Sequence, residues 1–159
     1  MNPYNGRQVD LEILQDIKIP SPFPQGVSIS SVQKTPKMVT GIEKAIQRYA
    51  QLLLTTMGDL PFDQELGGPM VQAISQGAVS DQGYLAHLFC VASSNALRAM
   101  QNDDQDPTFG MTPDDETVTS ASMVSGVVDY GTRTIAITVL LTTAAGNQYT
   151  FVAPVSTQG

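Results

Sequence analysis

The chain has 159 residues, enough for one domain with a full hydrophobic core, and only 14% of them are charged. Six basic residues face four acidic ones in residues 1–58, whereas two basic residues face eleven acidic ones from residue 59 onward. This distribution argues against nucleic-acid binding, which needs a basic stripe, and an acidic half instead suits a basic protein partner. A surface with so little charge is also typical of a protein that packs against neighbours.

Cys90 is the single cysteine, so an internal disulfide is excluded and the chain need not mature in an oxidising compartment. The sequence also contains no run of about 18 apolar residues, the length needed to span a bilayer, and no apolar core of a signal peptide. We therefore expect a protein that is made in the cytosol and has no membrane partner.

Residues 1–37 are rich in proline and are predicted to form an extended arm. The apolar residues between the prolines are too few to bury one another, so they must pack against something else. Two interpretations remain open: the arm is a strap over the core of its own domain, or it lies along a neighbouring subunit. The residues expected to make the arm contact are Leu11, Ile13, Ile17 and Phe23.

An amphipathic helix is predicted from Thr40 to about Gly58. Thr40 and Glu43 have the spacing of a capping box, and Gly58 stands where a helix stop would tolerate a positive φ. Apolar residues recur every three or four positions and define one buried face. They are Ile42, Ala45, Ile46, Tyr49, Leu52, Leu53 and Met57.

Two further helices are predicted after this one. The first opens at Pro69, which suits a first helical position, and closes at Gly77. The second starts near Ser80 or Asp81 and continues to about Gln101, with an apolar stripe at helical spacing. We expect it to pack on the helix at 40–58.

Residues 101–116 contain six acids, two prolines and no basic residue, which predicts an exposed loop. From Thr117 the hydrophobic period changes to two, and strands are predicted within 117–129, at 132–143 and at 147–153. Turns are expected at 129–131 and at 144–147. The fold class is therefore α+β: about three helices packed on a three-stranded antiparallel sheet with open outer edges, preceded by the arm.

No residues form a convincing catalytic, cofactor or metal site. Asp59, Asp63 and Glu65 cluster after the first helix, and two carboxylates could serve glycoside hydrolysis, although acids after a helix stop are usually solvated. Asn102, Asp104 and Asp106 begin like a calcium loop, but Pro107 and Pro113 stand where its glycine and closing glutamate belong. His87 and Cys90 have no partner at ligand spacing and are assigned to core or flank positions.

The segment GIEKAIQRYAQLLLTTMGDLPFDQELGG, followed by two helices and the segment VVDYGTRTIAITVLLTTAAGNQYTFVAPV, resembles the lysozyme-like baseplate wedge family of contractile phage tails, whose members are also called sheath initiators. The resemblance covers roughly residues 38–155, and LLLTTMGDLPFDQELGG is its most telling part. The family commonly has a Glu-Pro-Arg element after the third helix. Here Asp106 and Pro107 lack the arginine, which leaves that docking contact in doubt.

The resemblance implies two regions, an arm at 1–37 and a baseplate domain at 38–159, and a structural role without catalysis or cofactor. The sheet would exchange strands with the tail sheath protein, and the helical part would hold baseplate wedge and hub proteins, with the tube protein as a further candidate, in the tail baseplate of a virion. Asp106 and Pro107 would form the wedge contact. The sheath-facing residues would be Thr134, Ile135, Ile137, Val139, Leu141, Tyr149 and Phe151.

This hypothesis predicts that deleting the hairpin at 132–153 stops sheath polymerisation but leaves the helical part able to join the baseplate. The alternative is a peptidoglycan-cleaving glycosidase that uses Glu65 with Asp59 or Asp63. It predicts that the purified protein clears peptidoglycan and that Glu65→Gln stops it. The family label alone does not favour catalysis, because a shared fold is not a catalytic site.

Overall fold

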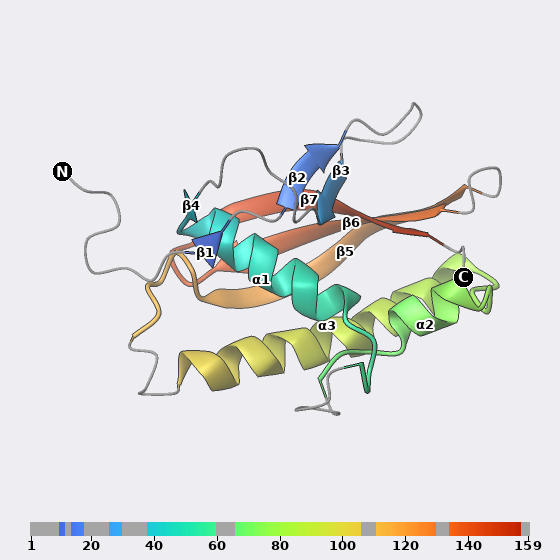
Figure 1. Ribbon diagram of the computed structural model, residues 1–159, viewed down its shortest axis with the longest axis horizontal. Coiled ribbons are helices and arrows are strands. Elements are labelled where there is room, and N and C mark those ends of the chain that lie inside the picture. The colour runs from blue at the N-terminus through green and yellow to red at the C-terminus, as the bar shows by residue number, and fades with distance from the viewer. Residues whose placement is uncertain are drawn as a thin grey trace.

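The computed structural model describes residues 10–11, 14–17, 26–29, 38–59, 66–105, 111–129 and 134–156. These residues have the predicted α+β fold, with the helices on one face of an antiparallel sheet (Figure 1). The helices are α1 (Ile42–Leu54), α2 (Met70–Ser75) and α3 (Gln82–Asp104). The strands of the main sheet are β5 (Val118–Asp129), β6 (Thr134–Thr143) and β7 (Gln148–Ser156), in the order β5-β6-β7.

Strand β6 lies in the middle of the sheet and is antiparallel to both neighbours. Its predicted apolar face is confirmed, because Ile135, Ile137, Val139 and Leu141 are all buried under the helices. Alternation along a strand sends every second side chain to the same face, so this pattern fixes which side of the sheet forms the core. In β7, Phe151 belongs to the same core.

The core lies between this face and the three helices. Tyr49 of α1 is fully buried, and its ring meets Phe151 edge to face with centroids 6.2 Å apart. α3 packs on α1 as predicted and also on β5. Close approach at α3 depends on glycine: a Cβ on Gly68 would lie 2.7 Å from the Cβ of Ala92.

The start of α1 differs from the capping-box prediction. The N-cap residue is Gly41, at φ 63°, and no side chain caps the helix. The Gly41 N–H instead donates to Glu116 Oε1 over 2.9 Å. A φ in this range is strained for any residue with a Cβ, so glycine and a distant carboxylate replace the local cap that Thr40 would have supplied.

Two helices also end at other residues than predicted. α1 stops at Leu54, where Thr55 turns into extended backbone, and Gly58, at φ 86°, belongs to the turn that follows. α3 continues through Asp104, so residues 101–104 are helical and the predicted loop is shorter than 101–116. The turn at 144–147 is confirmed, with Gly146 at φ 80°, whereas residues 130–133 lie outside the described part.

The described parts of the arm pair with one another and lie on the domain. β1 (Asp10–Leu11) pairs with β4 (Met38–Val39), and β2 (Leu14–Ile17) pairs with β3 (Gly26–Ile29), which lies beside β7 (Figure 1). The buried Gln47 side chain of α1 donates to Leu11 O over 2.7 Å and to Asp10 Oδ2 over 3.1 Å. At residues 10–11 the arm is therefore a strap on its own domain.

Of the predicted arm contacts, Leu11 is half exposed, at 49%. Ile17 lies in β2, and Ile13 and Phe23 lie outside the described residues. None of the helices in the described ranges has an apolar stretch long enough to cross a membrane.

Candidate functional site

β5 and β7 are the outer strands of the main sheet. β5 is hydrogen-bonded to β6 on one side, and no described strand pairs with its other side. An unpaired edge presents a row of backbone N–H and C=O groups that another strand can satisfy. Two register shifts, between Val118 and Ser120 and between Met123 and Ser125, interrupt the pairing with β6 and locally bend the strand.

Apolar side chains accompany this edge. Val124 is 60% exposed and Val127 is 42% exposed, although valine is normally placed inside a protein. Ser120 and Ser122 on the same strand are exposed as well. We call these four residues, Ser120, Ser122, Val124 and Val127, the β5 edge surface. It combines open backbone groups with apolar area and carries no charged side chain, which suits a protein strand better than solvent.

The face of the sheet away from the helices is covered over β6 and β7. Ala136 of β6 and Val152 of β7 alternate with the core residues, so they point to the other face, yet each is only 3% exposed. β3 lies beside β7 at this side of the sheet (Figure 1). Val127 of β5 lies opposite Ala136 on this same face, so the face is covered over β6 and β7 and exposed over β5.

The residues predicted to face the sheath protein have other surroundings in the isolated chain. Ile135, Ile137, Val139, Leu141 and Phe151 are buried in its own core. Thr134 is partly buried at the end of β6, and Tyr149 is 41% exposed near the hairpin turn. Their contact with a sheath subunit stays a prediction, but β6 has both edges occupied, so a strand could be added only at the outer strands, β5 or β7.

Three acids of residues 101–116 bind α1: Asp103 and Asp104, at the end of α3, and Glu116. The Arg48 guanidinium of α1 donates from Nη1 to Asp104 Oδ1 over 2.9 Å and from Nη2 to Asp103 Oδ2 over 2.8 Å. Thr112 Oγ1 also donates to Asp104 Oδ1 over 2.9 Å. Burial acts to lower the pKa of Arg48, but its hydrogen bonds to the two aspartates outweigh burial and raise that pKa.

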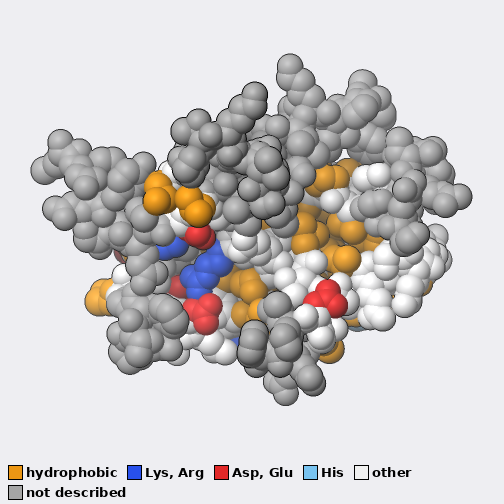
Figure 2. Space-filling view, in the orientation of Figure 1, with side chains coloured by type: hydrophobic (Ala, Val, Ile, Leu, Met, Phe, Trp, Pro, Cys, Tyr) orange, Lys and Arg blue, Asp and Glu red, His pale blue; other side chains and the backbone are white. Residues whose placement is uncertain are grey.

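Glu116 is the buried end of the same segment, at 3% exposed. Besides accepting from Gly41 N–H, its carboxylate pairs through Oε2 with Lys44 Nζ at 2.9 Å. Lys44 and Arg48 are one turn apart on α1, so one helix face binds the chain on both sides of residues 106–110. Basic and acidic side chains meet over this region, while most other described atoms on the same face are apolar or uncharged (Figure 2).

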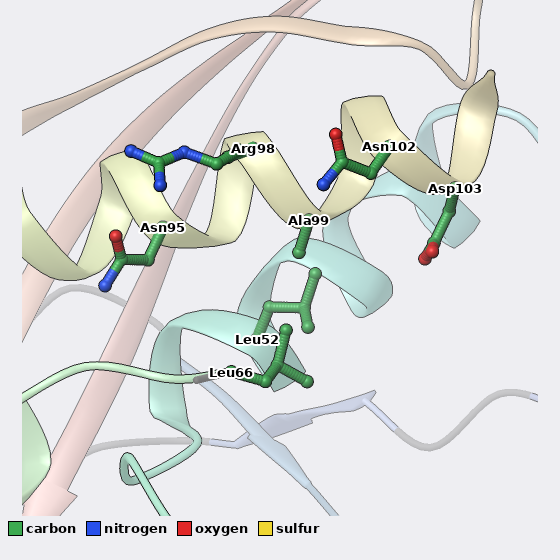
Figure 3. Close-up of a pocket in the computed structure, with 7 residues that line it drawn as sticks. All are labelled: Leu52, Leu66, Asn95, Arg98, Ala99, Asn102 and Asp103. Carbon is green, nitrogen blue, oxygen red and sulfur yellow. The ribbon is translucent and has the colours of Figure 1, made fainter. Parts of the chain in front are cut away.

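A groove of about 420 Å³ runs between α3 and the end of α1 (Figure 3). Leu52, Leu66 and Ala99 supply its apolar side chains. The polar side chains come from α3, at intervals close to one turn. They are Asn95, Arg98, Asn102 and Asp103.

The described structure does not bring the residues of the alternative catalytic and metal sites together. Asp59 is exposed, and Asp63 and Glu65 lie outside the described residues, so the glycosidase hypothesis stays untested. Asn102 and Asp104 are helical rather than part of a calcium loop, and the described part of the chain contains no cluster of metal-ligating side chains. His87 and Cys90 are both exposed on α3, and the wedge residues Asp106 and Pro107 fall outside the described ranges.

No protein-family model matches this chain, and no curated protein matches its sequence at a significant level.

Sequence reasoning missed the pairing of α1 with the acidic segment and the exposed valines of β5. The first had a signal: Lys44 and Arg48 are spaced four apart, and residues 101–116 contain six acids. The exposed valines gave no such signal, because periodicity does not show which strands lie at the outside of the sheet or which face of them is left uncovered.

Proposed function

We propose that this chain is a structural component of a contractile phage tail baseplate, which joins the wedge and tube to the first ring of tail sheath by accepting a strand of the sheath protein. The observation that supports it best is the β5 edge surface, an open strand edge with exposed apolar side chains. The choice of the tail sheath protein as the partner rests on the resemblance of residues 38–155 to the sheath-initiator family.

The chemistry of such a contact is backbone pairing. An added antiparallel or parallel strand would satisfy the open N–H and C=O groups of β5, and its side chains would cover Val124 and Val127. Register would come from the two irregularities in β5, because a bulge fixes which residues can pair. Low surface charge supports the same role, since few charged groups would need to be desolvated.

The structure changes how this proposal should be tested. Deleting residues 132–153 would remove all of β6 and most of β7, and with them Ile135, Ile137, Val139, Leu141 and Phe151 of the core. Such a truncated chain should not fold, so a loss of sheath assembly would carry no information about strand exchange. Substitutions on the β5 edge surface leave the core intact.

We therefore predict that Val124→Lys combined with Val127→Lys weakens binding to purified sheath protein at least tenfold. Lysine on an edge strand opposes strand addition because the incoming strand would have to bury its charge. Binding is measured by calorimetry, and sheath polymerisation by light scattering and electron microscopy. Thermal unfolding should be nearly unchanged, because both valines are largely exposed.

The matched control is Val91→Lys, which changes an exposed valine on α3, away from the sheet edge. It should bind sheath protein as the unmodified chain does. Equal binding by the β5 double variant would contradict strand addition at this edge, and no binding by the unmodified chain would contradict the choice of partner.

A further inference from the structure

Arg98 is a cation that pairs with no acidic residue in the described part of the chain. Arg98 is the only basic residue between positions 49 and 132, in a chain with net charge −7. The nearest acid in the groove, Asp103, is already paired with Arg48. Within the described part of the chain, the Arg98 guanidinium has no ion pair or hydrogen bond.

The helix around Arg98 also leaves it available. The residues one turn away on α3 are Ser94 and Asn95 on one side and Gln101 and Asn102 on the other, so no carboxylate stands at helical pairing distance. Figure 3 shows the Arg98 side chain extending along α3 toward Asn95 at the rim of the groove. A planar guanidinium held open in this way matches a carboxylate through two parallel hydrogen bonds.

The two asparagines add a second kind of recognition. Asn95 Nδ2 donates to Gly67 O over 3.1 Å, which orients its amide and leaves Oδ1 as an acceptor. The Asn102 amide has no partner among the described residues. Asn95 and Asn102 are two turns apart, roughly 10 Å along the helix, which is the span of about three residues of extended chain.

From these features we propose that the groove binds an extended acidic peptide segment of a partner protein. A Glu or Asp of that segment would pair with Arg98, the amides of Asn95 and Asn102 would bond its backbone, and Leu52, Leu66 and Ala99 would contact its apolar side chains. The partner contributes the negative charge that no described residue gives Arg98. This site lies on the helical face and does not depend on the β5 edge, so each can fail without the other.

The test uses the full chain labelled with ¹⁵N and a pool of N-acetylated, C-amidated pentapeptides with Glu fixed at the centre. We expect the pool to shift the side-chain amide signals of Asn95 and Asn102 and the Arg98 Nε–H signal. A pool with Gln at the centre should bind about tenfold more weakly, because a charge-assisted pair is replaced by a neutral one.

Arg98→Gln should remove the preference for Glu over Gln, and it should stay folded because Arg98 is exposed and its guanidinium makes no hydrogen bond or ion pair with a described residue. The control is Gln82→Glu, which makes the same change in net charge on an exposed residue of α3 outside the groove; it should keep the preference. Either no shift of the groove signals with the Glu pool or an unchanged preference in Arg98→Gln would overturn the proposal. N-acetylglutamate amide shifting the same signals equally would also overturn it, because the ligand would then be a free carboxylate rather than a peptide.

Discussion

At the scale of single residues, the described structure buries several polar side chains, and two of them, Tyr49 and Glu116, have well-defined partners. The Tyr49 hydroxyl donates to Ser93 Oγ over 2.8 Å, and Glu116 accepts from Gly41 and Lys44. A buried polar group is tolerated when it is hydrogen-bonded and becomes costly when its partner is removed. Each pair therefore gives a specific expectation for stability.

Burial raises the pKa of Tyr49 to about 12, although the hydrogen bond to Ser93 acts in the opposite direction. Because the folded chain favours the neutral phenol, this contribution to stability is full below pH 10 and is lost as pH rises from 10 to 12. Tyr49→Phe should lower the free energy of unfolding by about 1 kcal/mol at pH 7, and this deficit should shrink or reverse near pH 12.

The measurement is urea unfolding of both proteins across this pH range, compared as a difference curve so that other titrating groups cancel. Ser93→Ala should destabilise more than Tyr49→Phe, because it leaves the Tyr49 hydroxyl buried without its partner. A constant difference from pH 7 to 12 would contradict the raised pKa.

Glu116→Gln should destabilise the fold by about 2–3 kcal/mol, because Lys44 loses its paired charge in a largely buried position. The start of α1 should also fray, since an amide is a weaker acceptor for the Gly41 N–H. Asp114→Asn makes the same chemical change on an exposed side chain two residues away and should have little effect. Chemical denaturation compares the two, and equal stability would show that the Glu116 contacts contribute nothing.

At the scale of elements, the segment before α2 approaches α3 at a distance that only a glycine allows. A Cβ on Gly68 would lie 2.7 Å from the Ala92 Cβ and 2.9 Å from its Cα. We expect Gly68→Ala to destabilise by about 1–3 kcal/mol, the range for overpacking.

The matching variant is Ala92→Gly, which removes one of the two clashing atoms but weakens α3 by about 1 kcal/mol as glycine does in a helix. Combined with Gly68→Ala, it should cost less than the sum of the two single changes. Thermal unfolding of the unmodified chain, the two single variants and the double variant gives the double-mutant cycle. Strict additivity would argue against the contact.

Element positions followed from the sequence because periodicity is a local property. Apolar positions at helical spacing and the alternation of Ile135, Ile137 and Val139 predicted α1 and β6 within a few residues. The prediction that Met57 belongs to the buried face of the helix was wrong, because α1 ends at Leu54 and Met57 is 51% exposed in the turn that follows. The cap of α1 did not follow, because its acceptor, Glu116, is 75 residues away from Gly41. A local motif at Thr40 and Glu43 was outcompeted by a tertiary contact that no short window contains.

At the scale of the whole molecule, the candidate sites depend on which segments end up side by side. The alternating β6 side chains were predicted as a sheath contact. An apolar strand face has the same sequence pattern whether it packs against a partner protein or against helices of its own chain. Likewise, Asn95, Arg98 and Asn102 are visible as polar residues of α3, yet the groove exists only because α1 and Leu66 lie opposite them.

The asymmetry of the sheet has a consequence for growth. β3 packs against β7, whereas the outer side of β5 pairs with no described strand, so we expect an added strand to join at β5 first. A sheet that accepts a strand at one edge can start a row of strand-paired chains. It is less suited to a position inside such a row, where each chain must pair at both edges. Such a chain would set the direction and the starting point of an assembly while leaving its length to the components that follow.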